Sequence, residues 1–152
     1  MQRVLELAKA NVDHGGWPFA ALITDAKGAI LAEAANGVQT SHDPSDHAEI
    51  AAIRLATQKR KSPDLSDCTM YVIGLPCPMC LSCMVMAKLT KLVYAVNVPE
   101  KDAALQSLPA TDSLYNLVSS EYGGGVIEYT QLDSFSKDGV QLFMDWDSRR
   151  EG

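Results

Sequence analysis

The sequence has no long apolar segment and no excess of positive charge. No stretch approaches the roughly 20 consecutive apolar residues of a membrane-spanning helix, so no membrane association is expected. Lys and Arg number 13 against 19 Asp and Glu, which gives a net charge of −6 and a pI near 4.9. Because an acidic surface repels phosphate groups, nucleic acid is not expected as a partner.

The sequence also has few cysteines, and their spacing does not suit a disulfide framework. Three of the four lie between positions 77 and 83. The first residues carry Glu and Lys at helical spacing instead of the apolar core of a signal peptide. We therefore expect a cytoplasmic protein, in which crowded cysteines indicate metal binding or catalysis. A length of 152 residues with 47% apolar content predicts one globular domain over 1–152.

Hydrophobic periodicity predicts strands that alternate with helices. Strands are expected over 19–24, 30–35, 68–73, 91–96 and 126–130, the first two joined as a hairpin around Gly28. Helices are expected over 2–13, from an entry at 43–46 through Ala48 to about Lys59, over 77–87 and over 137–148, with short helical pieces near 100–107 and 112–119; residues 36–46 read as loop. This order predicts an α/β fold, a three-layer α/β/α sandwich with a mixed sheet of about five strands.

Two short motifs carry the chemistry, and each lies at the predicted start of a helix. The first is His47-Ala48-Glu49, and the second contains Cys77 and Cys80 in Pro-Cys-Pro-Met-Cys. The 30 positions from His47 to Cys77 accommodate one helix and one returning strand. The two helix starts are therefore expected to lie side by side at one edge of the sheet.

These residue types at this spacing suit a catalytic zinc ion. Cysteines at i and i+3 share a helix face, and the positive end of the helix dipole favours their thiolates. With His47 they supply three of four tetrahedral ligands, which leaves one position for a water molecule of lowered pKa. Glu49 need not be a ligand and can act as general base and then general acid.

The other cysteines allow an alternative that the pattern disfavours. Cys83 extends the motif to Cys-x-x-Cys-x-x-Cys, as in some iron–sulfur proteins. The usual fourth cysteine is missing, since Cys68 falls upstream in a predicted strand. Cys68 and Cys83 are therefore expected to be small buried apolar side chains.

Taken together, the two motifs resemble those of the zinc-dependent cytidine and nucleobase deaminases, whose signature is H-x-E followed by P-C-x-x-C. The similarity extends from about Gly15 to Asn97. The runs 40–49 and 51–54, with Gly16, Pro18 and Phe19, are most similar to bacterial guanine deaminases. The resemblance implies a Zn²⁺-dependent aminohydrolase of cyclic amidines that releases ammonia, with a role in purine catabolism.

The resemblance also implies substrate contacts. Asn36 would bind a purine edge, Asp112 would contact the base, Phe19 would offer an apolar face, and Trp17 would lie at the pocket rim. From the residues alone, without the resemblance, other roles are also open: Asn36 could end the hairpin, Asp112 could cap a helix, and the side chains of Phe19 and Trp17 could belong to the core. Leu75 replaces the family's Glu, and the segment 145–152 lacks its aromatic tail. Guanine, a related aminopurine or a triazine ring therefore stay open as substrates.

Other functions fit the same motifs less well. A tRNA adenosine deaminase has nearly the same signature, but the acidic pI and the lack of a basic C-terminal helix argue against it. A cytosine or cytidine deaminase is a further alternative. A zinc-stabilised binding module would not need Glu49. The helix after Cys77 is apolar nearly all round, which predicts burial against a second copy in a homodimer.

Overall fold

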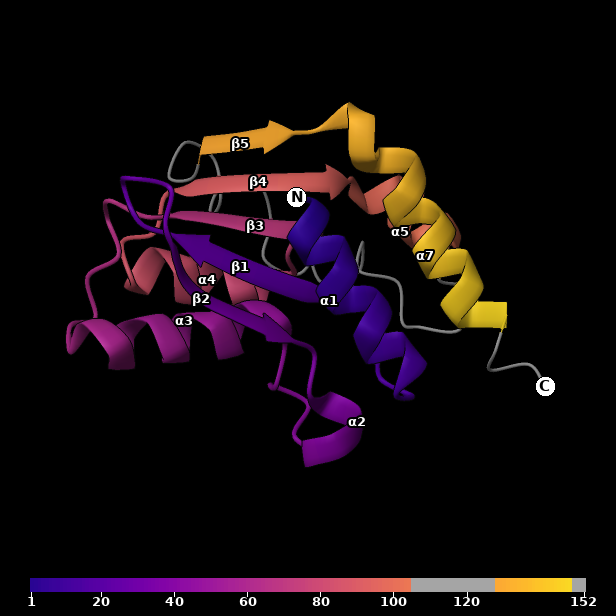
Figure 1. Ribbon diagram of the computed structural model, residues 1–152, viewed down its shortest axis with the longest axis horizontal. Helices are drawn as coiled ribbons and strands as arrows, with labels where there is room; N and C mark the ends of the chain where they lie inside the picture. The colour runs from indigo at the N-terminus through magenta and orange to yellow at the C-terminus, as the bar shows by residue number, and fades with distance from the viewer. Residues whose placement is uncertain (105–127, 149–152) are drawn as a thin grey trace.

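A computed structural model of the chain describes residues 1–104 and 128–148. Within these ranges five strands form one mixed sheet in the order β2-β1-β3-β4-β5 (Figure 1). The neighbours β2, β1 and β3 pair antiparallel, whereas β3, β4 and β5 pair parallel. Their bounds are β1 (Ala20–Thr24), β2 (Ile30–Ala35), β3 (Thr69–Gly74), β4 (Lys91–Val96) and β5 (Glu128–Gln131).

Helices cover both faces of this sheet, so the predicted three-layer sandwich is confirmed (Figure 1). One face carries α3 (Ala48–Arg60) and α4 (Pro78–Met86). The other carries α1 (Gln2–Asp13), α5 (Val98–Ala104) and α7 (Ser136–Ser148), the last preceded by the 3₁₀ turn η1 (Asp133–Phe135). Within the described ranges, no helix combines the length and apolar character that a membrane span needs.

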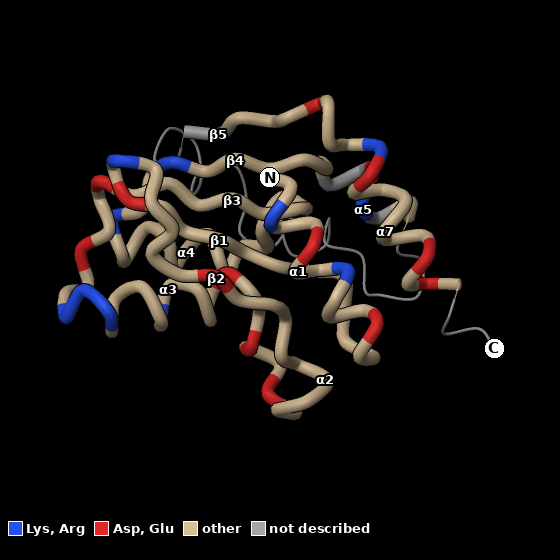
Figure 2. Tube along the Cα trace, viewed as in Figure 1, with Lys and Arg blue, Asp and Glu red and all other residues tan. Residues whose placement is uncertain are grey.

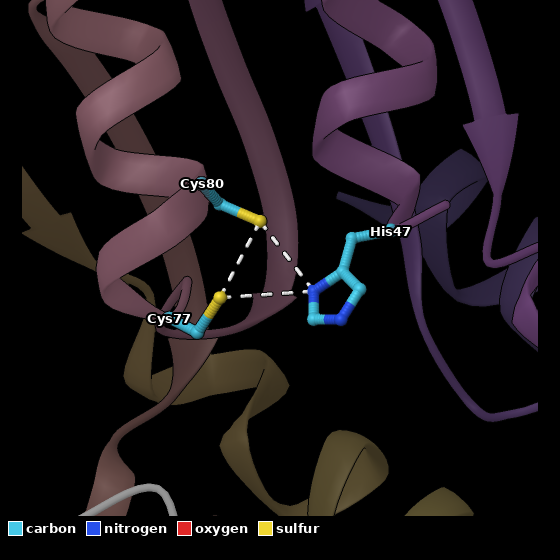
Figure 3. Close-up of side chains that lie close together, drawn as sticks. All are labelled: His47, Cys77 and Cys80. Carbon is cyan, nitrogen blue, oxygen red and sulfur yellow. Dashed lines mark hydrogen bonds between the residues drawn. The ribbon is translucent and has the colours of Figure 1, made fainter. Parts of the chain in front are cut away.

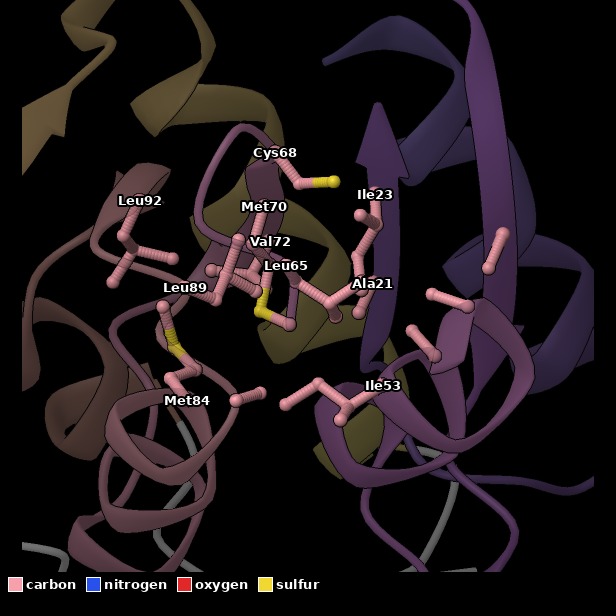
Figure 4. Packing of buried hydrophobic residues seen from close by; sticks show 14 of the residues in the cluster. Ala21, Ile23, Ile53, Leu65, Cys68, Met70, Val72, Met84, Leu89 and Leu92 are labelled. Atoms are coloured by element: carbon pink, nitrogen blue, oxygen red, sulfur yellow. The ribbon is translucent and has the colours of Figure 1, made fainter. Parts of the chain in front are cut away.

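Apolar side chains fill the space on each side of the sheet. The cluster under α3 and α4 is drawn in Figure 4 and includes Ile23, Ile53, Met70, Met84 and Leu92. The cluster under α1 and α7 includes Val4, Ala8, Leu22, Phe143 and Trp146. Side chains alternate between the faces of a strand, so β1 contributes to both clusters. Burial of both faces fixes the register of this strand.

The predicted hairpin is confirmed, and its turn is specific. Asp25 Oδ1 accepts hydrogen bonds from the backbone N–H groups of Lys27 and Ala29, both at 2.9 Å. Gly28 has φ +81°, a backbone conformation that favours glycine. The turn therefore holds β1 and β2 in antiparallel register.

The segment before α3 differs from the sequence prediction in one way. The short helix α2 (Val38–Ser41) lies in a stretch predicted as loop. The helix entry predicted at 43–46 is confirmed: Asp43 Oδ1 accepts hydrogen bonds from Ser45 N and Oγ and closes a local turn, and α3 begins at Ala48 after its N-cap His47. The expected helix over 112–119 lies outside the described residues.

The topology brings four chain segments to one edge of the sheet. Strands β2, β3 and β4 end there, and antiparallel β1 starts there. The helices α3 and α4 both begin at this edge, since α4 follows β3 directly. Ligands of open α/β sheets bind outside the carboxyl ends of the strands. The segments 17–19, 36–47 and 75–77 are therefore the natural walls of a site.

Candidate metal centre

His47 is placed by the start of α3. It is the N-cap residue, with extended φ −72° and ψ 149°, and its carbonyl accepts the first helical hydrogen bond, from Ala51 N at 2.9 Å. The extended backbone turns its side chain away from the helix and toward the start of α4 (Figure 3). The side chain is half-buried.

The start of α4 places two cysteines on the same face. Cys77 is the N-cap residue, Pro78 occupies the first turn, and Cys80 follows within that turn. Proline suits this position because its fixed φ matches a helix and its missing N–H would have no helical acceptor. Cys80 is buried and Cys77 is half-buried, so the pair is open on one side only.

The three donor atoms have the spacing that zinc requires. His47 Nδ1 lies 3.7 Å from Cys77 Sγ and 3.5 Å from Cys80 Sγ, and the sulfurs are 3.7 Å apart (Figure 3). With bonds of about 2.3 Å to sulfur and about 2.0 Å to nitrogen, a tetrahedral zinc ion holds two sulfurs about 3.8 Å apart and a sulfur and a nitrogen about 3.5 Å apart. The donor set and its geometry therefore fit zinc, as expected from the sequence.

The electrostatics of the group favour a cation. Hydrogen bonding with Cys80 and with His47 lowers the pKa of Cys77 to about 4, so this thiol ionises readily. The hydrogen bond with Cys77 and burial raise the pKa of Cys80. Two thiolates this close repel one another unless a positive charge lies between them. A divalent cation would stabilise both thiolates at once.

Glu49 lies in the first turn of α3 with only 8% of its surface exposed. It lies two residues after His47 at the same end of α3, and its carboxyl group interacts electrostatically with His47 and Cys77. Burial raises the pKa of Glu49. A carboxyl group that takes up a proton readily suits proton transfer.

Asn36 follows β2 and is 5% exposed. Its Oδ1 accepts a hydrogen bond from Val38 N at 3.1 Å, so it closes the hairpin and opens α2, which is one of the roles expected from sequence. Its carbonyl oxygen accepts a hydrogen bond from Asn11 Nδ2 at 3.0 Å. A role in substrate binding stays a prediction.

Asn11 is the residue at this edge that the sequence interpretation missed. Its Nδ2 donates to Trp17 O at 2.8 Å as well as to Asn36 O, and so joins the segment before β1 to the segment after β2. The sequence contained a signal for this role. Asn11 lies seven residues after Val4 and three after Ala8, so its polar amide is on the apolar face of α1.

The other candidate residues are distributed differently. Phe19 packs on Phe143 with ring centroids 5.4 Å apart, and Trp17 meets Trp146 edge to face at 6.3 Å. Both rings contact the cluster under α7, the core alternative considered above. Asp112 lies outside the described residues. Cys68 is fully buried, as predicted, whereas Cys83 is only half-buried where it packs against the cluster under α4; neither belongs to the donor group.

Comparison with known proteins agrees with this geometry. The family described as the cytidine and deoxycytidylate deaminase zinc-binding region matches residues 1–96. The chain belongs to this family. Among deaminases, the chain is 43% identical over 98 residues to the guanine deaminase of Bacillus subtilis, a match that covers 64% of this chain and 62% of that protein. The match thus spans less than two thirds of this relative.

Solved structures extend the likeness over nearly the whole of this chain. The guanine deaminase from Nitrosomonas europaea superposes with a TM-score of 0.77 at 26% identity, covering 97% of this chain and 82% of that one. The structure of NE0047 in complex with 2,6-diaminopurine gives a TM-score of 0.80 at 26% identity, covering 97% and 79%. The predicted fold and the predicted family are therefore both confirmed.

Proposed function

We propose that this chain is a zinc-dependent hydrolytic deaminase of a free nucleobase-like ring, with guanine or a related aminopurine as substrate. The observation that carries the proposal is the convergence of His47 Nδ1, Cys77 Sγ and Cys80 Sγ at zinc-ligand spacing, beside a buried Glu49. The similarity to guanine deaminase over 98 residues supports the substrate class.

Each residue has a distinct role in the proposed reaction. His47, Cys77 and Cys80 hold the zinc ion, and the half-buried sides of His47 and Cys77 leave room for a fourth ligand. Zinc would supply Lewis acidity and lower the pKa of a water molecule. Glu49 would take one proton from that water and give it to a ring nitrogen as the oxygen adds to the ring carbon, and would then move the second proton from the added hydroxyl to the amine, which leaves as ammonia while the ring keeps a carbonyl. Its raised pKa suits a group that must both accept and release a proton.

The substrate is proposed to be a neutral ring without ribose or phosphate. The net charge is −6, and Figure 2 shows Lys and Arg gathered at the C-terminal end of α3, the end away from His47, whereas on α1 and α7 they are mixed with Asp and Glu. This arrangement disfavours a phosphate-bearing substrate or RNA. We propose that Asn36 binds a ring edge, that Asp112 accepts hydrogen bonds from ring N–H groups, and that Trp17 and Phe19 contribute apolar surface.

The test is ammonia release from a panel of guanine, 2,6-diaminopurine, adenine, cytosine, cytidine and tRNA. We expect guanine to react faster than cytosine or adenine, since those rings present fewer N–H donors to Asp112, whose carboxylate would be left unpaired. Asp112→Asn should slow guanine most. A Glu49→Gln protein prepared in parallel controls for contaminating deaminases. Faster reaction with cytidine or tRNA than with any free base would contradict the substrate.

We also propose a cytoplasmic homodimer that acts in purine catabolism, with neither nucleic acid nor membrane as partner. The dimer is supported by apolar side chains that α3 and α4 leave exposed: Leu55, Met79, Val85 and Met86. These lie on one layer of the sandwich, and a second copy of the chain would cover them.

A further inference from the structure

Two positions beside the site residues are in direct contact. Gly37 follows Asn36, and Asp46 precedes His47. Gly37 N donates a hydrogen bond to Asp46 O at 2.9 Å. This bond joins the segment that carries the proposed substrate amide to the segment that carries a metal ligand.

The contact at Gly37 depends on space, not on backbone conformation. Gly37 has φ −103° and ψ −2°, which other residues also adopt. A β-carbon at this position, however, would overlap Asp46 Oδ2 and lie 2.8 Å from Asp46 Cγ. The Asp46 side chain is only 24% exposed and occupies the volume that a side chain at position 37 would need. An alanine at position 37 must therefore displace either the Asp46 carboxylate or the backbone at position 37.

Movement at Gly37 would reach Asn36 directly. Asn36 is 5% exposed, and its backbone N–H donates to Phe19 O at 3.0 Å while its carbonyl accepts from Asn11. These bonds fix Asn36 from the side of α1 and β1. The contact with Asp46 fixes the next residue from the side of His47.

We propose that Asp46 is a positioning residue for substrate binding: its side chain fills the space above Gly37 and so sets Asn36 relative to His47. The inference rests on the proposed function, because it concerns how the same site holds its ring. Asp46 would thus act on substrate binding without contacting the substrate, through its contact with Gly37.

The test is a double-mutant cycle of Gly37→Ala, Asp46→Ala and the pair together. Gly37→Ala should raise KM for guanine about 10-fold or more, since small displacements in a site are costly, with zinc content unchanged. Asp46→Ala alone should raise KM less. The pair should return KM close to the wild-type value, because the alanine occupies the vacated volume. If Gly37→Ala only destabilised the fold, it would lower the melting temperature, and adding Asp46→Ala would not restore KM.

Two control variants separate size from charge. Asp46→Asn keeps the shape of the side chain and should leave KM unchanged. Arg54→Gln removes the cation whose NH1 lies 4.0 Å from Asp46 Oδ1 and should also have no effect. Unchanged KM in Gly37→Ala, or a double variant no better than Gly37→Ala, would overturn the inference.

Calorimetric titration with 2,6-diaminopurine separates this inference from the proposed function. If the wild-type protein deaminates no base, the proposed function fails, and binding of the ring then decides the inference. Weakened binding in Gly37→Ala with recovery in the pair supports the positioning role. Absence of binding by the wild-type protein overturns it.

Discussion

At the scale of single residues, the burial of Glu49 is informative because a carboxyl group at a helix start is usually solvated. Burial disfavours its charged form, while the helix N-terminus and His47 favour it. We expect Glu49→Gln to keep the fold, the melting temperature and the zinc, and to lose at least about 100-fold in kcat. Steady-state kinetics with elemental analysis check this. A variant with a near-normal rate would remove the proton-transfer role.

The donor group makes a prediction that does not depend on activity. Freshly purified protein should contain about one zinc per chain, as a single three-ligand site requires. The Cys77→Ser, Cys80→Ser double variant should contain almost none, and Cys83→Ser, which lies outside the group, should keep it. Elemental analysis measures all three. Metal-free wild-type protein, or full zinc in the double variant, would rule out the assignment.

Residues whose role is set locally were predictable from sequence, and residues whose role is set by topology were not. His47, Cys77 and Cys80 were found because spacing and helix starts determine where their side chains point. Asn11 was missed because its role is to donate hydrogen bonds to two carbonyl groups, Trp17 O and Asn36 O, which only the folded chain brings together.

At the scale of secondary-structure elements, Asn11 is the polar link between α1 and the site edge of the sheet. Asn11→Ala leaves two carbonyl groups without this donor, so we expect a loss of about 1–3 kcal/mol of unfolding free energy. Urea denaturation measures it. Lys9→Ala, at an exposed position of the same helix, should change stability by less than about 0.5 kcal/mol. Equal effects of the two substitutions would contradict the link.

The C-terminal end of α3 is held to the loop before β3 by Arg60 and Asp67. Arg60 NH2 lies 2.7 Å from Asp67 Oδ2 in a two-bonded pair, and this hydrogen bonding lowers the pKa of Asp67 to about 2. Because the pKa of Asp67 is lower in the folded protein than in the unfolded chain, the ion pair stabilises the fold at pH values above the unfolded pKa of about 4. This stabilisation is lost as the pH falls toward the folded pKa of about 2.

Asp67→Asn should therefore destabilise the protein at pH 6 and match the wild type near pH 2. Urea denaturation across this range is the measurement. Asp133→Asn, at an exposed position in the turn η1, controls for the general effect of removing a carboxylate. A constant difference between Asp67→Asn and wild type at all pH values would show that the pair does not titrate as described.

The periodicity of apolar residues predicted the long helices and the strands, but it could not predict short or irregular segments. The strand over 91–96 and the helix over 2–13 were predicted with their observed bounds, because apolar residues recur at clear intervals. The four-residue α2 is too short to show a period. The start of α3 was predictable because a turn at 43–46, in which Asp43 bonds to Ser45, leads directly to the N-cap His47.

At the scale of the whole molecule, the sandwich leaves one helical layer incompletely covered. The sequence identified α4 as apolar on nearly every side, and the structure shows which side chains the sheet does not bury. Met86 is 84% exposed, with Val85 and Met79 nearby on the same helix and Leu55 on α3. Exposed apolar side chains on adjacent helices are typical of an interface between subunits.

The proposed dimer can be tested by charging this layer. Met86→Glu would bury a carboxylate in the interface, where an unpaired charge is costly, so we expect the wild-type protein to sediment as a dimer and Met86→Glu as a monomer at micromolar concentration. Met144→Glu is the matched control: Met144 is 51% exposed on α7, across the sheet from α4, and the same change there should leave the dimer intact. Analytical ultracentrifugation with circular dichroism distinguishes dissociation from unfolding. A monomeric wild-type protein, or a Met86→Glu variant as dimeric as Met144→Glu, would exclude α4 as the contact, and solvent would then cover this layer.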